Sequence, residues 1–170
     1  MSFDNDPRRK QELAGRSVAD SLYKNIFGKS IEIIRMERDE ELILDMKFGI
    51  DVKLALQTGQ ILLGQEKFLS PFYAKYSSVT VEYEQNQFTK EPGDWFSLAP
   101  QFYFVGYLTE SGRTFDPWIL LNWPNTVLAT WQRQIPWKLN SNKDGRARAS
   151  FKYCQMAQFP DTCVIAQSRG

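Results

Sequence analysis

The chain has 170 residues, 42% hydrophobic and 24% charged, which is the composition of one domain with a packed core. A net charge of +1 excludes a uniformly basic nucleic-acid-binding surface, so any such binding must come from a local patch. The absence of histidine excludes Ser-His-Asp and Cys-His catalysis, and two cysteines cannot fill a usual zinc site.

The start of the chain is predicted to be helical. Residues 1–6 are polar and we expect them to be disordered, whereas Pro7 suits a first helical turn. From residue 8 to residue 27 the apolar positions recur at helical intervals, and Gly28 follows as a C-cap. No apolar run approaches the roughly 20 residues that cross a bilayer, and the polar N-terminus does not resemble a secretory signal. We therefore expect a cytoplasmic protein with no membrane partner.

The remaining pattern alternates strands and helices. The order predicts an α/β fold, a single domain over residues 1–170 with one mixed central β-sheet flanked by helices. The expected strands are 30–37, 42–56, 60–69, 78–84, 102–108, 118–123 and 147–153, with a short helix at 95–101 capped by Asp94 and a longer one at 124–134.

The hairpin over residues 48–69, FGIDVKLALQTGQILLGQEKFL, carries the chemistry. Because side chains alternate along a strand, Gln65 and Lys67 share one face while Glu66 points to the other. Whether Asp51 joins them depends on the turn. A two-residue loop at 58–59 pairs Asp51 with Glu66, and a three-residue loop at 57–59 pairs it with Gln65. We expect the second register, which gathers Asp51, Gln65 and Lys67 on one face.

Such a face suits a divalent metal beside a phosphate. Oxygen ligands favour Mg²⁺ or Mn²⁺, and here they would be the Asp51 carboxylate, the Gln65 carbonyl and the backbone carbonyl of Glu66. A metal polarises the phosphate and lowers the pKa of its bound water. Lys67 would hold the attacking water or stabilise the charge that develops on the phosphate.

These residues resemble a known family. FGIDVKLAL followed by ILLGQEKF is similar to the PD-(D/E)xK nuclease superfamily, in which an Asp on one strand precedes a (D/E/Q)-x-Lys on the next. The resemblance covers about residues 12–69. It implies a restriction-endonuclease-like core, a homodimer, and an acid from the preceding helix, for which Glu12 is the match. Gln65 replaces the usual acid, as in Mrr-like branches, and no proline directly precedes Asp51.

A basic stretch, residues 137–152, could contact a nucleic-acid backbone, although a solvated loop explains it equally well. Trp137, beside it, is a candidate for base stacking, whereas Glu82 is a weaker candidate ligand that a solvated strand position explains better. The candidate nucleic-acid-binding residues are Lys53, Lys138, Lys143, Arg146, Arg148 and Lys152.

The sequence therefore favours a metal-dependent deoxyribonuclease, more typically an endonuclease than an exonuclease. No recognition module is visible, so target choice would come from dimerisation, from DNA structure or from a targeting partner protein. The alternative is a catalytically inactive module of the same fold that binds nucleic acid or a partner protein. RNA as the substrate remains a third reading.

Overall fold

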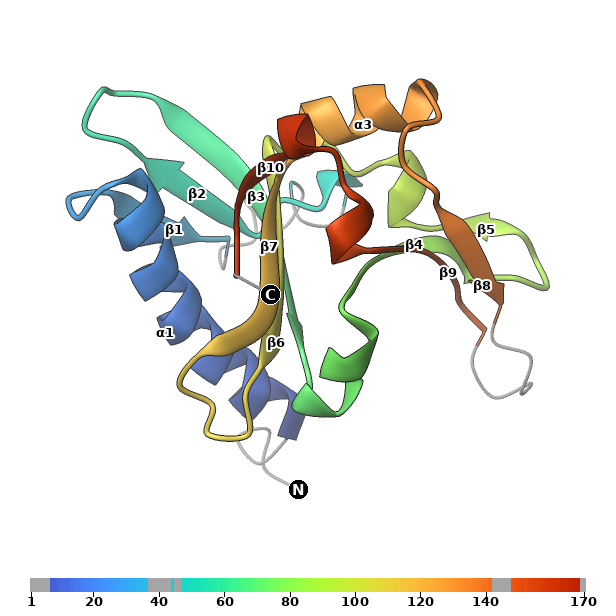
Figure 1. Cartoon of the computed structure of the whole chain (residues 1–170), viewed down its shortest axis with the longest axis horizontal. Coiled ribbons are helices and arrows are strands. Elements are labelled where there is room, and N and C mark those ends of the chain that lie inside the picture. The colour runs from blue at the N-terminus through green and yellow to red at the C-terminus, as the bar shows by residue number, and fades with distance from the viewer. Residues whose placement is uncertain (1–6, 37–43, 45–46, 142–147, 169–170) are drawn as a thin grey trace.

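A six-stranded sheet and a four-stranded sheet form the molecule (Figure 1). The computed structural model describes residues 7–36, 44, 47–141 and 148–168. The six-stranded sheet has the order β1-β2-β3-β6-β7-β10, and β3 and β6 are its parallel pair. Its strands are β1 (Glu32–Arg35), β2 (Val52–Ala55), β3 (Ile61–Leu69), β6 (Phe102–Leu108), β7 (Phe115–Asn122) and β10 (Val164–Gln167).

The second sheet has the order β5-β4-β9-β8 and is antiparallel. Its strands are β4 (Ser78–Asn86), β5 (Glu91–Pro92), β8 (Lys138–Ser141) and β9 (Ser150–Gln155). The helices are α1 (Pro7–Phe27) and α3 (Trp123–Trp131), with 3-10 turns η2 (Pro71–Tyr76), η3 (Asp94–Phe96), η4 (Met156–Gln158) and η5 (Asp161–Cys163).

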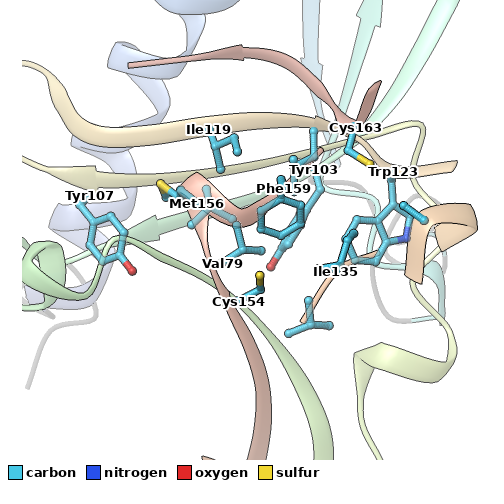
Figure 2. Close-up of a cluster of buried hydrophobic side chains, with 14 residues drawn as sticks. Val79, Tyr103, Tyr107, Ile119, Trp123, Ile135, Cys154, Met156, Phe159 and Cys163 are labelled. Carbon is cyan, nitrogen blue, oxygen red and sulfur yellow. The ribbon is translucent and has the colours of Figure 1, made fainter. Parts of the chain in front are cut away.

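Both faces of the six-stranded sheet are covered. Every residue of β6 is buried, and alternate side chains enter different cores. Phe102 and Phe104 pack with Ala19 and Tyr23 of α1 on one face. On the other face, Tyr103 and its neighbours pack against the second sheet, and Figure 2 shows this cluster with Val79 and Cys154 across from Ile119. The first helix and the second sheet therefore enclose β3 and β6 between them.

Helix α1 lies close to β3 because of a glycine. A Cβ added to Gly15 would stand 2.6 Å from the Phe68 ring, nearer than real Cβ atoms approach. Gln11, one turn earlier on the helix, donates from Nε2 to the carbonyl oxygen of Phe68 at 3.3 Å. The start of α1 is thus fixed beside the end of β3. Within the residues described, no helix has the length and apolar character to cross a membrane.

The mixed α/β class is confirmed, but the expectation of one sheet flanked by helices is wrong. After η2, Ser77 adopts a left-handed conformation (φ 41°), and the next residue begins β4, which pairs with β9. The Tyr107 hydroxyl holds this corner, since it donates to the carbonyl oxygen of Ser78 at 2.8 Å. Strand spacing in the sequence does not reveal this separation, because the partner β9 lies about 70 residues further along the chain.

The expected strand from residue 42 is also wrong at its start. Leu44, Lys47 and Phe48 are helical, and the strand begins only at Val52; the other residues of 37–46 lie outside the described part. Gly49, with φ +58°, follows the helical residues as a left-handed terminator. A short apolar run such as LILDMKF satisfies both strand and helix periodicity, so the pattern alone could not decide.

Other expectations need small changes. Helix 8–27 and its glycine terminator are confirmed, with Gly28 at φ +114°. The short helix near Asp94 is a 3-10 turn whose N-cap is Gly93, and α3 begins one residue early with Asn122 as its cap. The expected disorder of residues 1–6 concerns positions outside the described residues.

Candidate functional site

The turn of the β2–β3 hairpin adopts the three-residue form. The carbonyl oxygen of Gln60 accepts from the amide of Leu56 at 2.9 Å, which leaves residues 57–59 as the loop. Gly59 is left-handed at φ +82°. Val52 stands opposite Gly64 and Ala55 opposite Ile61, a register that extends to Asp51 opposite Gln65. The expected register of the hairpin is confirmed.

Asp51, just before β2, is fixed by backbone contacts. Its amide donates to the carbonyl oxygen of Gly64 at 2.8 Å, and its own carbonyl oxygen accepts from the Met36 amide at 3.0 Å. The carboxylate atom Oδ2 accepts from the amide of Glu66 at 2.8 Å. This carboxylate therefore lies directly beside the β3 backbone at the Gln65-Glu66-Lys67 segment.

Glu66 points toward α1, as the alternation predicts. Its Oε1 accepts from the Tyr23 hydroxyl at 2.9 Å, and its Oε2 lies 3.1 Å from Nε of Arg35. Arg35 also binds Asp20 at 2.6 Å. Burial raises the pKa of the Glu66 carboxyl, while Arg35 and the Tyr23 hydrogen bond partly oppose the shift. Burial of the Tyr23 hydroxyl, and then the negative charge of Glu66, raise the pKa of Tyr23.

Lys67 points to the opposite side, toward the second sheet. Its Nζ donates to the carbonyl oxygen of Thr80 on β4 at 3.0 Å, and that oxygen also accepts from the Tyr103 hydroxyl at 3.0 Å. Burial lowers the pKa of the Lys67 ammonium, and the nearby charges of Asp94 and Glu82 oppose the shift. The site thus holds a nearly enclosed lysine with a lowered pKa.

Gln65 provides a test of whether the site suits a cation. Its Oε1 is buried without a hydrogen-bond partner and stands near Gly49, where an added Cβ would lie 2.7 Å from it. A buried carbonyl oxygen with no donor is costly unless it binds something else, and a metal ion is one such partner. Among the described residues, no group of three or more Asp, Glu, Cys or His side chains is arranged for a metal. A cation would therefore need the Gln65 amide and backbone oxygens in addition to Asp51.

A cavity of about 380 Å³ lies beside these residues, and Glu12, Asp51, Glu66 and Lys67 are among those that line it. Glu12 is on the second turn of α1, where its side chain is half-exposed and binds Arg16 at 2.8 Å. The structure thus brings residues Glu12, Asp51 and Lys67 to one cavity, while the Lys67 ammonium itself is directed to Thr80 on the other side of β3. Gln65 is not part of its lining, because its side chain lies under Gly49.

In the described part of the chain, the basic candidates divide between the two sheets: Lys53 is on β2, whereas Lys138, Lys152 and Arg148 are on or beside β8 and β9. Lys138 and Arg148 are exposed, and Lys53 is half-buried. Lys152 lies over the rings of Trp95 and Tyr83, with Nζ 4.2 Å and 4.9 Å from their centroids. The positions of Lys143 and Arg146 lie outside the described residues.

Trp137 packs inward, contrary to its suggested role in base stacking. Its ring stands edge-on to Trp95 at 5.1 Å and to Phe159 at 5.6 Å, and its Nε1 donates to Oγ1 of Thr130. Glu82 lies near Lys67 and Asp94, and burial and then Asp94 raise its pKa.

Sequence reasoning missed the residues that support the hairpin from outside it. Tyr23 and Arg35 hold the Glu66 side chain, Asp20 binds Arg35, and Asp94 lies near Lys67. Tyr23 is buried on the apolar face of α1. A buried tyrosine hydroxyl usually has a hydrogen-bond partner, so this residue is the one sign in the sequence that a polar group packs against the helix. The other contacts depend on chain segments that meet only in the fold.

In comparisons with known proteins, no family model, curated protein or solved structure matches this chain.

Proposed function

We propose that the chain is a metal-dependent nuclease that hydrolyses phosphodiester bonds in DNA, with a restriction-endonuclease-like core formed by α1 and the β1–β3 meander. The observation that carries the proposal is the register of the β2–β3 hairpin. It sets Asp51 opposite Gln65 and beside the backbone of Glu66, and the half-buried Lys67 follows Gln65 by two residues. The unpartnered Oε1 of Gln65 supports a cation ligand at this place.

Each site residue has a distinct role in the proposed reaction. Asp51, the Gln65 amide oxygen and the Glu66 carbonyl would hold Mg²⁺ or Mn²⁺, which when bound polarises the phosphate and activates water. The Gln65 side chain lies beside Gly49, outside the cavity lining, and would have to turn toward Asp51 to complete this set. Glu12, across the cavity, contributes a second carboxylate that can orient the attacking water. The Lys67 ammonium uses one N–H for Thr80 and retains donors for a phosphate oxygen, where its charge stabilises the transition state.

Cleavage of supercoiled plasmid in Mg²⁺ and in Mn²⁺ tests the proposal. Asp51→Ala and Lys67→Ala are each expected to lower the cleavage rate by about 100-fold or more. Glu110→Ala, an exposed acid in the turn between β6 and β7, is the matched control and should cleave as the wild type does. Cleavage that survives both site substitutions would show that the activity belongs elsewhere.

One observation favours the second candidate, a module of this fold that binds nucleic acid without cutting it. The Lys67 ammonium is enclosed and already donates to a backbone carbonyl, as a structural lysine would. Binding of labelled DNA by the wild type, with no cleavage in either metal, would establish this reading.

A further inference from the structure

An exposed aromatic surface follows the site directly along the chain. We call the side chains of Phe72, Tyr73, Lys75 and Tyr76 the η2 aromatic face. Phe72 is 69% exposed, Tyr73 50% and Tyr76 55%. Three large exposed rings within five residues form a contiguous apolar patch, and such patches on a protein surface commonly mark an interaction site.

The rings are held in a fixed arrangement. Phe72 and Tyr73 stand edge-to-face with centroids 5.1 Å apart, and Tyr73 and Tyr76 lie nearly parallel at 28°. The turn beneath them begins with a Ser70 cap and a proline at its first position. Ala74 packs into the core between the sheets, so the backbone of the turn is anchored. The rings therefore pack against one another on an anchored turn, an arrangement that lowers the entropy cost of binding a partner.

The η2 aromatic face lies close to the proposed active site. Phe72 follows Lys67 by five positions, so the two Cα atoms are at most about 18 Å apart. The cavity beside Asp51 also extends to this end of β3, because Phe68 and Gln11 line it. A nucleic-acid strand whose phosphate lies at the site would bring nucleotides near this face.

The charges around the face fit a polyanion. Residues 70–77, SPFYAKYS, contain one lysine and no acid. Lys75 Nζ lies 5.2 Å from the ring centroids of both Phe72 and Tyr76, so a positive charge sits among the rings. Aromatic rings interleaved with cations are typical of surfaces that stack bases and bind phosphates.

We propose that the η2 aromatic face stacks unpaired bases, so that the substrate of this nuclease is a strand that is single-stranded on one side of the cut. Paired bases in a duplex hide their faces and could not stack there. This substrate assignment rests on the proposed nuclease function, whereas the stacking itself does not.

Fluorescence anisotropy in EDTA tests the stacking without cleavage. The probes are labelled oligothymidine, an abasic strand of the same length and a DNA duplex. The wild type should bind oligothymidine more tightly than the abasic strand. Tyr73→Ala should weaken oligothymidine binding at least fivefold, which corresponds to about 1 kcal/mol of stacking, and should leave abasic and duplex binding unchanged. The controls Phe88→Ala and Trp131→Ala remove rings that are 68% and 84% exposed elsewhere and should bind as the wild type.

The results separate this inference from the nuclease proposal. If the wild type binds the abasic strand as tightly as oligothymidine, or Tyr73→Ala binds oligothymidine like the wild type, base stacking is wrong and the face serves a protein partner instead. Base-dependent binding that Tyr73→Ala abolishes, with no plasmid or oligonucleotide cleavage in any metal, would keep the stacking surface and overturn the nuclease.

Discussion

Lys67 is a half-buried cation, and charged groups taken partly out of water usually cost folding free energy in return for function. Its removal need not leave the Thr80 carbonyl unsatisfied, because the Tyr103 hydroxyl also donates to that oxygen. We therefore expect Lys67→Met to lose cleavage but no more than about 1 kcal/mol of unfolding free energy relative to the wild type. Urea unfolding followed by circular dichroism measures the stability.

The exposed Lys29→Met serves as the control for the general effect of this substitution. A loss of more than about 2 kcal/mol in Lys67→Met would exceed what one neutral hydrogen bond supplies. In that case Lys67 would be a structural residue, and the proposed active site would lose its cation.

Two arginine–carboxylate pairs, Arg35–Glu66 between β1 and β3 and Arg16–Glu12 within α1, differ in burial, and this difference predicts how much each contributes to stability. The side chain of Glu66 is 4% exposed and that of Arg35 12%, whereas Glu12 is 54% exposed beside Arg16. Arg35→Met strands a buried carboxylate and should cost about 3–5 kcal/mol of unfolding free energy. Arg16→Met breaks an exposed pair and should cost about 1 kcal/mol or less. Equal losses in urea unfolding would show that the network around Glu66 does not stabilise the fold.

The cost of Arg35→Met should also depend on pH. Burial raises the pKa of Glu66 in the folded state, and loss of Arg35 removes the charge that opposes this shift. A carboxyl whose folded pKa is raised contributes stability below its unfolded pKa and loses it as the pH rises through the folded pKa. The destabilisation should therefore shrink as the pH falls from neutral toward the ordinary pKa range of a glutamate. The double variant Arg35→Met/Glu66→Gln lacks the titrating group, so a similar pH dependence there would contradict this explanation.

At the level of elements, the hairpin depends on one left-handed residue. Nothing lies within 4 Å of a Cβ added to Gly59, so its substitution is limited by the backbone alone. Gly59→Ala should cost about 1–2 kcal/mol because φ is +82°. Gly59→Asn should cost less, since asparagine tolerates this conformation. Urea unfolding compares the two, and an alanine variant as stable as the wild type would mean that the turn can adopt another form.

The hairpin was predictable because its information is local. Gly59 fixes the turn, and the apolar alternation of Val52 and Leu54 fixes which face is buried, so turn and pattern agree on one register. The helical residues near Leu44 were not predictable from a short apolar run. Nor was the separation of β4 into a second sheet, because its partner β9 is distant in sequence and the composition of a strand does not identify the strand that it pairs with.

At the level of the whole molecule, β3 lies between two layers, and the candidate site draws on both. Glu66 is held from the α1 side by Tyr23 and Arg35, while Lys67 reaches Thr80 in the second sheet. Contacts on both faces of the sheet therefore fix the backbone of β3 at Glu66 and Lys67. A metal bound by Asp51 and this backbone would need the whole fold in place, so its binding should be linked to global unfolding.

This linkage gives a prediction for thermal stability. A ligand that binds only the native state at about 100 times its Kd stabilises by about 2.7 kcal/mol, or about 5–10 °C for a chain of this size. Mn²⁺ should therefore raise the Tm of the wild type and of Glu110→Ala, but not that of Asp51→Asn. Because Asn keeps the size of Asp while removing its charge, an equal rise in Asp51→Asn would place the bound metal outside the hairpin. A rise confined to proteins that retain Asp51 would link metal binding to the register set by the three-residue loop.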